Sequence, residues 1–201
     1  MTTKIQLSHA EMQLMCNADV ILTKNVVLQK TTALLESVQE AQSNYQKENE
    51  TFLPQEVFSV PPKISRGENY NGLPWLVLDY PRLFTRTDTF AIRTFFWWGR
   101  FFSSTLQLSG FYKNLFQNKI AAAYPVLAQS HFIGIGADAW QHHFEADNYQ
   151  PISQMSQKEF ETFVTDHSFI KIATPFPLSS WPGADELLLN SWKGYLKILS
   201  T

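Results

Sequence analysis

The segment from Thr89 to Gly110 reads TFAIRTFFWWGRFFSSTLQLSG and carries the strongest structural signal in the chain. Two runs rich in aromatic, β-branched and hydroxyl residues flank the pair Gly99-Arg100. Glycine at the first position of a two-residue loop suits a type II′ turn between paired strands. The segment therefore predicts an antiparallel hairpin, in which Arg93 lies opposite Leu106.

This register sorts the hairpin side chains into two faces, because successive residues of a strand point to opposite sides. The more apolar face is the expected core face and carries Ala91, Arg93, Phe95, Trp97, Phe102, Ser104, Leu106 and Leu108. The other face is half aromatic and half hydroxyl, which suits a surface covered by a ligand or a partner. Its members are Phe90, Ile92, Thr94, Phe96, Trp98, Phe101, Ser103, Thr105, Gln107 and Ser109.

Further strands are predicted on both sides of this hairpin. Trp75–Tyr80 and Phe169–Ala173 have β-branched and aromatic residues in extended patterns, and Phe132–Ile135 and Ala139–Glu145 form a second predicted hairpin. Helical segments lie between these groups of strands, and paired hairpins separated by helices favour an α+β class. We therefore expect an antiparallel sheet built from hairpins, with packed helices and a long helical N-terminal segment.

Start and stop signals mark three helices. Ser8 with Glu11, and Ser156 with Glu159, have the spacing of the capping box that begins a helix. The turn signal Pro182-Gly183 precedes the last helix of the chain.

The N-terminal quarter is predicted to be helical, since no glycine or proline occurs from Met1 to Leu53. It forms either one long helix or two short ones, with a break expected at Thr23–Asn25. Apolar positions recur from Val27 to Tyr45 at alternating steps of four and three, which fits either an amphipathic helix on the core or a dimerising coiled coil. We expect one domain over residues 1–201, with a helical segment over 1–50 and an α+β core over 54–201.

Composition narrows the class of protein. Aromatic residues make up 14% of the 201 residues and charged residues only 17%, which excludes a disordered chain. The formal net charge of −2 argues against a protein that binds nucleic acid, whose surface is basic. No secretory signal and no membrane span are evident, so the expected location is the cytoplasm. The single cysteine, Cys16, is expected to be a small buried residue.

The arginines are unevenly placed, because all five lie between Arg66 and Arg100 while the lysines are spread over the chain. Guanidinium groups bind carboxylate and phosphate in a two-pronged geometry, so the cluster indicates a site for an anion. Arg93 stands among apolar neighbours and must be paired, since a lone buried charge is strongly destabilising. Its partner is either a carboxylate of the chain, Asp79 or Asp88, or an anionic ligand.

The stretch Trp140–Asp147 offers the second chemical candidate. On a strand, His143 and Glu145 share one face and form a candidate acid–base pair. With a distant histidine they have the elements of a metal triad, but the spacing is not diagnostic, and we expect no metal and no cofactor. The chain has no Walker A sequence, nucleophile elbow or paired Cys-x-x-Cys motif.

Two hypotheses for the function follow. The first is a structural or partner-binding domain, with the N-terminal helix as an element of a homo-oligomer. The second is an enzyme or binding protein for a small anionic ligand, and the sequence leaves open which of the two it is. The anion would be held by Arg93 or Arg100 beside Thr94, Trp98, Thr105 and Gln107, with His143 and Glu145 as acid and base.

Overall fold

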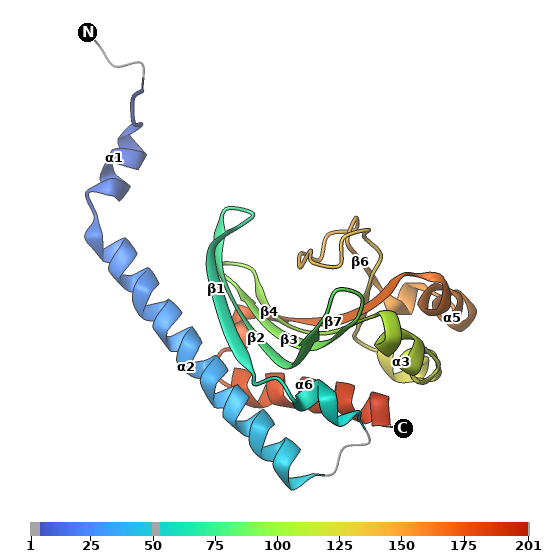
Figure 1. Cartoon of the computed structure of the whole chain (residues 1–201). Coiled ribbons are helices and arrows are strands. Elements are labelled where there is room, and N and C mark those ends of the chain that lie inside the picture. Colours follow the sequence, from blue (N-terminus) through green and yellow to red (C-terminus); the bar gives the residue numbers. More distant parts are fainter. Residues whose placement is uncertain (1–4, 50–52, 201) are drawn as a thin grey trace.

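The computed structural model describes residues 5–49 and 53–200 and has an α+β fold, as the sequence predicts (Figure 1). Residues 1–4 and 50 of the predicted helical segment, residues 51 and 52, and residue 201 of the predicted core lie outside the described residues. In the described part of the chain, seven strands form one antiparallel sheet in the order β1-β2-β3-β4-β7-β5-β6. The strands are β1 (Lys63–Tyr70), β2 (Leu73–Phe84), β3 (Thr89–Trp97), β4 (Phe101–Ser109), β5 (Phe132–Gly134), β6 (Tyr149–Pro151) and β7 (Phe169–Pro177).

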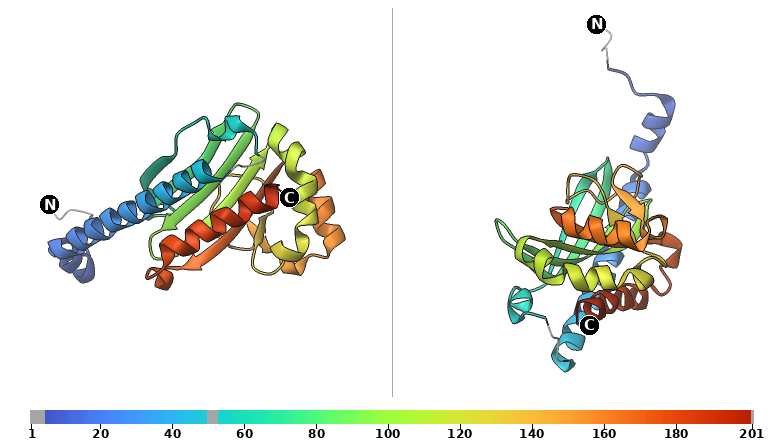
Figure 2. Two further views of the ribbon diagram at one scale, coloured as in Figure 1. Left: turned by 90° about the horizontal axis from the view of Figure 1, so that it is seen from below. Right: turned by 90° about the vertical axis from the view of Figure 1, so that its right-hand side faces the viewer.

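Helices cover one side of this sheet, which we call the helical face. Figure 2 shows the two longest helices lying across it, and shorter helices gather beside β7. The helices are α1 (His9–Met15), α2 (Ala18–Glu48), α3 (Gly110–Ala122), α4 (Tyr124–Leu127), α5 (Gln157–Asp166) and α6 (Ala184–Ser200). Both predicted capping boxes are confirmed, at the first residues of α1 and of α5, and the predicted C-terminal helix is α6.

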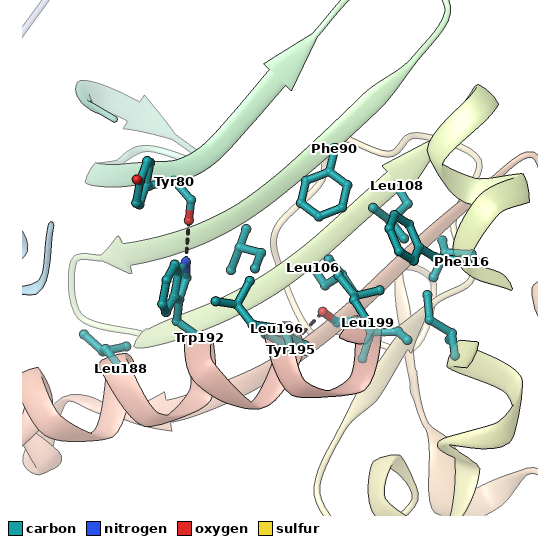
Figure 3. Close-up of a cluster of buried hydrophobic side chains, with 14 of the residues drawn as sticks. Tyr80, Phe90, Leu106, Leu108, Phe116, Leu188, Trp192, Tyr195, Leu196 and Leu199 are labelled. Carbon is teal, nitrogen blue, oxygen red and sulfur yellow. Dashed lines mark hydrogen bonds between the residues drawn. The ribbon is translucent and has the colours of Figure 1, made fainter. Parts of the chain in front are cut away.

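The main hydrophobic core lies between the helical face and α6 (Figure 3). Trp192 and Leu199 of α6 are fully buried against Phe90 and Leu106 of the central strands. The indole N–H of Trp192 donates to the main-chain oxygen of Tyr80 at 2.6 Å, which ties the helix to β2. Burial of this many large side chains is the main contribution to the stability of the fold.

The central hairpin forms as predicted, but its register differs by one residue. Trp97 pairs with Phe101, so the loop has three residues, Trp98 to Arg100, in place of two. Arg93 consequently lies opposite Thr105 and not Leu106. Gly99 adopts a φ of +67°, which glycine reaches without strain and which a three-residue loop requires at one position.

The shift of one residue changes which side chains share a face. The helical face of the observed hairpin carries Phe90, Ile92, Thr94 and Phe96 of β3 and Phe102, Ser104, Leu106 and Leu108 of β4. The predicted core face was therefore wrong: Arg93 shares its face with Thr105 and Gln107, on the opposite side of the sheet. We call that side the loop face.

The second predicted hairpin is only half correct. Its first arm is β5, but residues 139–145 form no strand, and the partner of β5 is β6. The intervening residues 135–148 fold back across the loop face, above the sheet in Figure 1, and we call them the covering loop.

The N-terminal helices project beyond the sheet and its core (Figure 1). The break falls at Cys16–Asn17, so the predicted break at Thr23–Asn25 is wrong and α2 runs without interruption to Glu48. The C-terminal half of α2 packs on the core, whereas residues 5–26, which we call the N-terminal arm, are exposed at nearly every position. Cys16 lies in this arm and is exposed, contrary to the expectation of a buried residue.

Candidate functional site

The loop face carries a cluster of buried polar side chains beneath the covering loop. Antiparallel pairing across β2, β3, β4 and β7 brings them to one side of the sheet, because residues directly opposite each other share a face. All are less than one-tenth exposed. The cluster consists of Asp79, Arg93, Ser103, Thr105, Gln107 and Lys171.

Arg93 is held by a carboxylate of the chain. Its Nε donates to Oδ1 of Asp79 at 2.7 Å and its Nη2 to Oδ2 at 3.4 Å, which is the two-pronged geometry expected of this pair. Its guanidinium also lies over the ring of Trp140, 5.3 Å from the centroid, and near Phe84 at 5.9 Å. The charge of Arg93 is therefore balanced within the protein.

Asp88, the other carboxylate predicted as a partner of Arg93, has a different role. Its Oδ1 accepts the main-chain N–H of Phe111 at 2.7 Å, at the start of α3. This contact satisfies one of the unpaired N–H groups of the first turn, and it holds the pKa of Asp88 below its ordinary value.

Lys171 connects the middle of the covering loop and its C-terminal end to the sheet. Its Nζ donates to the main-chain oxygen of Gln141 at 2.8 Å and to Oδ1 of Asn148 at 3.1 Å. The ammonium also lies 4.6 Å from the centroid of the Tyr149 ring. Lys171 is 1% exposed, and burial lowers its pKa to about 8.

Tyr70, at the end of β1, holds the middle of the loop. Its hydroxyl accepts the main-chain N–H groups of His142 at 2.6 Å and His143 at 3.1 Å, and donates to Oε1 of Gln141 at 3.2 Å. The imidazole of His142 stacks on Phe95 of the sheet, with 4.5 Å between ring centroids. The covering loop is thus hydrogen-bonded to two separate strands of the sheet, β1 through Tyr70 and β7 through Lys171.

Of the predicted ligand-binding residues, three share the loop face and three do not. Arg93, Thr105 and Gln107 lie together there. Thr94 is buried on the helical face and Trp98 packs against the core. The sixth residue, Arg100, lies in the hairpin loop with its guanidinium 5.4 Å from the centroid of the Trp97 ring.

The predicted acid–base residues are both in the covering loop. His143 lies 3.3 Å from Asp147, between Nε2 and Oδ1, while its Nδ1 lies 3.2 Å from the Tyr70 hydroxyl. Glu145 is exposed. The loop conformation removes the strand geometry on which a shared face for His143 and Glu145 depended, and Asp147 is the carboxylate within reach of the imidazole.

Two buried polar atoms of the loop face have no hydrogen-bond partner within the described residues. They are Nη1 of Arg93 and Oε1 of Gln107. One is a donor and the other an acceptor. No three His, Cys, Asp or Glu side chains among the described residues are arranged to hold a metal ion.

Three residues of the site, Lys171, Tyr70 and Asn148, are not among those predicted from the sequence. A signal was available for the first of these, because Lys171 stands between Ile170 and Ile172 in a strand that reads as buried. A lysine in that setting needs acceptors to compensate for its burial. No comparable pattern marks the other two, whose roles depend on the path of the covering loop.

Acidification is expected to destabilise the protein through His142. Burial, followed by the nearby charges of Arg93 and Lys171, lowers the pKa of His142 well below its ordinary value. Below about pH 6.5 the unfolded chain therefore takes up a proton that the folded chain does not, and the free energy of unfolding falls as the pH falls.

Urea unfolding at pH 7.5 and 5.5 measures this effect. From the wild-type protein we expect a loss of about 1 kcal/mol attributable to His142, and His142→Phe should remove that loss. His9→Gln, in the exposed α1 helix, is the control. An unchanged difference between the two pH values in His142→Phe would contradict the assignment.

No helix in the described part of the chain is long and apolar enough to cross a membrane. Comparison of the chain with protein-family models, with curated proteins and with solved structures finds no match.

Proposed function

We propose that this chain is a partner-binding domain whose partner is a second copy of itself, joined through the N-terminal arm. The supporting observation is the apolar surface of the arm. Leu14 is 60% exposed, Met15 65%, Ile21 57% and Leu22 58%. Large apolar side chains gathered on one projecting element are typical of an interaction surface.

Helix stability supports the same proposal. The α1 helix has seven residues and none of them is buried. Isolated helices of this length are unstable in water and usually depend on packing. A partner that covers the arm would supply that packing.

The charges of the arm favour a second copy over a membrane surface. Residues 5–23 contain no lysine or arginine, although helices that bind anionic membranes carry them on the polar face. The acidic residues Glu11 and Asp19 lie in the arm, and Lys30 follows the arm on α2, toward the core. Two arms packed antiparallel would place acidic residues beside basic ones, as a two-fold symmetric interface allows.

The arm continues into a helix that is packed on the core, so an interface formed by the arm would have a defined orientation. Beyond the arm, the same helix packs on the core through its buried residues Thr31, Leu35, Val38 and Gln42. At the base of the arm, Lys24 forms an ion pair with Glu68 of β1. The part of the arm that belongs to α2 therefore has a fixed direction relative to the sheet.

The alternative function, an anionic ligand held by Arg93, has weaker support. Asp79 already balances the charge of Arg93, and an anion would have to compete with that carboxylate. The covering loop would also have to open, which breaks the contacts of Lys171 and Tyr70. Self-association requires neither change.

Sedimentation equilibrium over a concentration series tests the proposal. We expect the wild-type protein to reach twice the mass of one chain at micromolar concentration, and Ile21→Glu and Leu22→Glu each to weaken association at least about tenfold, since each places a charge in an apolar interface. Leu115→Glu on α3, where the leucine is 46% exposed, is the matched control and should associate like the wild type.

Three outcomes would overturn the proposal. The first is a wild-type protein that stays monomeric throughout. The second is a dimer that the two arm variants leave intact. The third is a monomer that cosediments with anionic vesicles, since the arm would then be a membrane-binding element.

A further inference from the structure

A pocket of about 770 Å³ lies on the helical side of the molecule, between α3 and α4 on one wall and α6 on the other. Its volume is within the range of small-molecule binding sites. It contains no residue of the N-terminal arm and none of the loop face, so it is independent of the association proposed above.

Small side chains keep the pocket wide. Ala122 at the end of α3 and Ala123 after it line one wall, and Gly194 lines the opposite wall in the middle of α6. A Cβ atom built on Gly194 would meet no heavy atom within 4 Å. Glycine in a helix interior is less stable than alanine by about 1 kcal/mol. The chain therefore has a residue here that weakens the helix and leaves the pocket open.

The floor of the pocket is uncharged. Phe176 of β7 and His131 both line it. The ring of His131 packs edge-on against Tyr195, with 5.8 Å between centroids, and burial lowers the pKa of His131. A neutral imidazole and an aromatic ring suit an apolar ligand body.

The charged residues of the lining are both basic. Lys119 and Lys197 line the pocket, and no aspartate or glutamate does. Lys119 is positioned by the chain, because its Nζ donates to the main-chain oxygen of Leu199 at 2.8 Å. An ammonium retains further donors after one such bond, so it can also bind an anion.

We propose that this pocket binds a small molecule with an apolar body and one carboxylate, a medium-chain fatty acid being the simplest form. The apolar body lies between α3 and α6, beside Gly194 and above Phe176. The carboxylate lies toward Lys119 and Lys197. This chemistry follows from a pocket whose surface is mostly apolar, although neutral polar side chains also line it, and whose charged lining residues are both basic.

Titration calorimetry with decanoate tests the proposal, and 1-decanol is the matched ligand without the charge. We expect decanoate to bind the wild-type protein at least about tenfold more tightly than decanol, because charge-assisted hydrogen bonds are the stronger kind. Decyl phosphate distinguishes a carboxylate site from a general anion site. The proposal expects decanoate to bind at least as tightly as decyl phosphate.

Gly194→Leu fills the pocket from the middle of α6. Because open space surrounds the position and leucine favours a helix, the variant should melt at or above the wild-type temperature. It should bind decanoate at least about tenfold more weakly, since its side chain occupies the space of the ligand. Gly183→Leu, where a Cβ atom also meets nothing within 4 Å, lies outside the pocket and should bind normally.

Lys119→Gln and Lys197→Gln test the position of the carboxylate. At least one should weaken decanoate binding severalfold and leave decanol binding unchanged, whereas Lys47→Gln at the far end of α2 should change neither. The proposal is overturned if the wild-type protein binds no decanoate at about 1 mM, a limit that corresponds to roughly −4 kcal/mol. Equal affinity for decanol, tighter binding of decyl phosphate, or unaltered binding by Gly194→Leu would overturn it as well.

Discussion

Replacing Arg93 with methionine is expected to lower the free energy of unfolding by about 3–5 kcal/mol. The change removes the guanidinium and leaves the carboxylate of Asp79, a residue that is 6% exposed in the structure, without its partner. A buried charge without compensation is strongly destabilising, whereas the paired charges are tolerated. The contact of the guanidinium with Trp140 of the covering loop is lost at the same time.

Urea unfolding of three variants separates the causes. Arg100→Met removes an arginine from the hairpin loop and should cost less than about 1 kcal/mol, because exposed charges contribute little. The double variant Asp79→Leu with Arg93→Met removes both charges and should recover much of the loss. If Arg93→Met alone costs less than about 1 kcal/mol, the pair does not have the structural role assigned to it.

Replacing Trp192 with alanine is expected to cost about 3–5 kcal/mol, the range for loss of a large buried aromatic side chain. Trp192 is fully buried, and Figure 3 shows it beside Tyr80 of β2. Its ring stacks on Tyr80 of β2, with 6.2 Å between centroids, and meets Tyr45 of α2 edge-on at 5.9 Å. Its loss leaves a cavity where α6, β2 and α2 meet.

A conservative variant isolates the hydrogen bond of Trp192. Trp192→Phe keeps an aromatic ring but cannot donate to the main-chain oxygen of Tyr80. We expect it to cost about 1–3 kcal/mol, the penalty for a buried polar group without a partner. Trp181→Ala, at a position that is 36% exposed, is the control for loss of an indole. Thermal unfolding measures the stability of these variants. If Trp181→Ala is less stable than Trp192→Ala, the role given to Trp192 is wrong.

Much of the fold could be predicted because its signals are local. Capping boxes at Ser8 and Ser156 depend on residues three positions apart, and both are present. The central hairpin follows from two β-rich runs around Gly99. The α+β class follows from the order of such segments along the chain.

The register of the hairpin could not be predicted, because two loop lengths fit the same sequence. A two-residue loop and a three-residue loop can both place Gly99 at a positive φ. In the structure the main-chain N–H of Trp98 donates to the oxygen of Pro74, a residue of β2. The observed loop is therefore accompanied by a hydrogen bond to β2, a strand that precedes the hairpin in the sequence. No pattern within the hairpin itself indicates this hydrogen bond.

The covering loop shows why the alternation of apolar and polar residues is not enough to predict a β-strand. Trp140, His142 and Phe144 alternate with polar residues as in a strand, and their rings do pack on other aromatic side chains. The backbone around them pairs with no strand. Alternation reports which side chains are apolar, whereas a strand also requires a neighbouring backbone to bond with. The arrangement of the candidate site therefore depends on contacts between segments that are far apart in the sequence.

The two outer edges of the sheet have a consequence for how copies of the chain can meet. An unpaired edge can add a strand from another molecule, and proteins prevent this with short strands, charges and irregular pairing. At one edge, β6 has three residues and ends at Pro151, which lacks an N–H group. At the other, β1 exposes Lys63, Arg66 and Glu68, and its pairing with β2 is irregular after Gly67. Growth of the sheet into a fibre is therefore disfavoured at both ends, which leaves the N-terminal arm as the element for the proposed contact between copies.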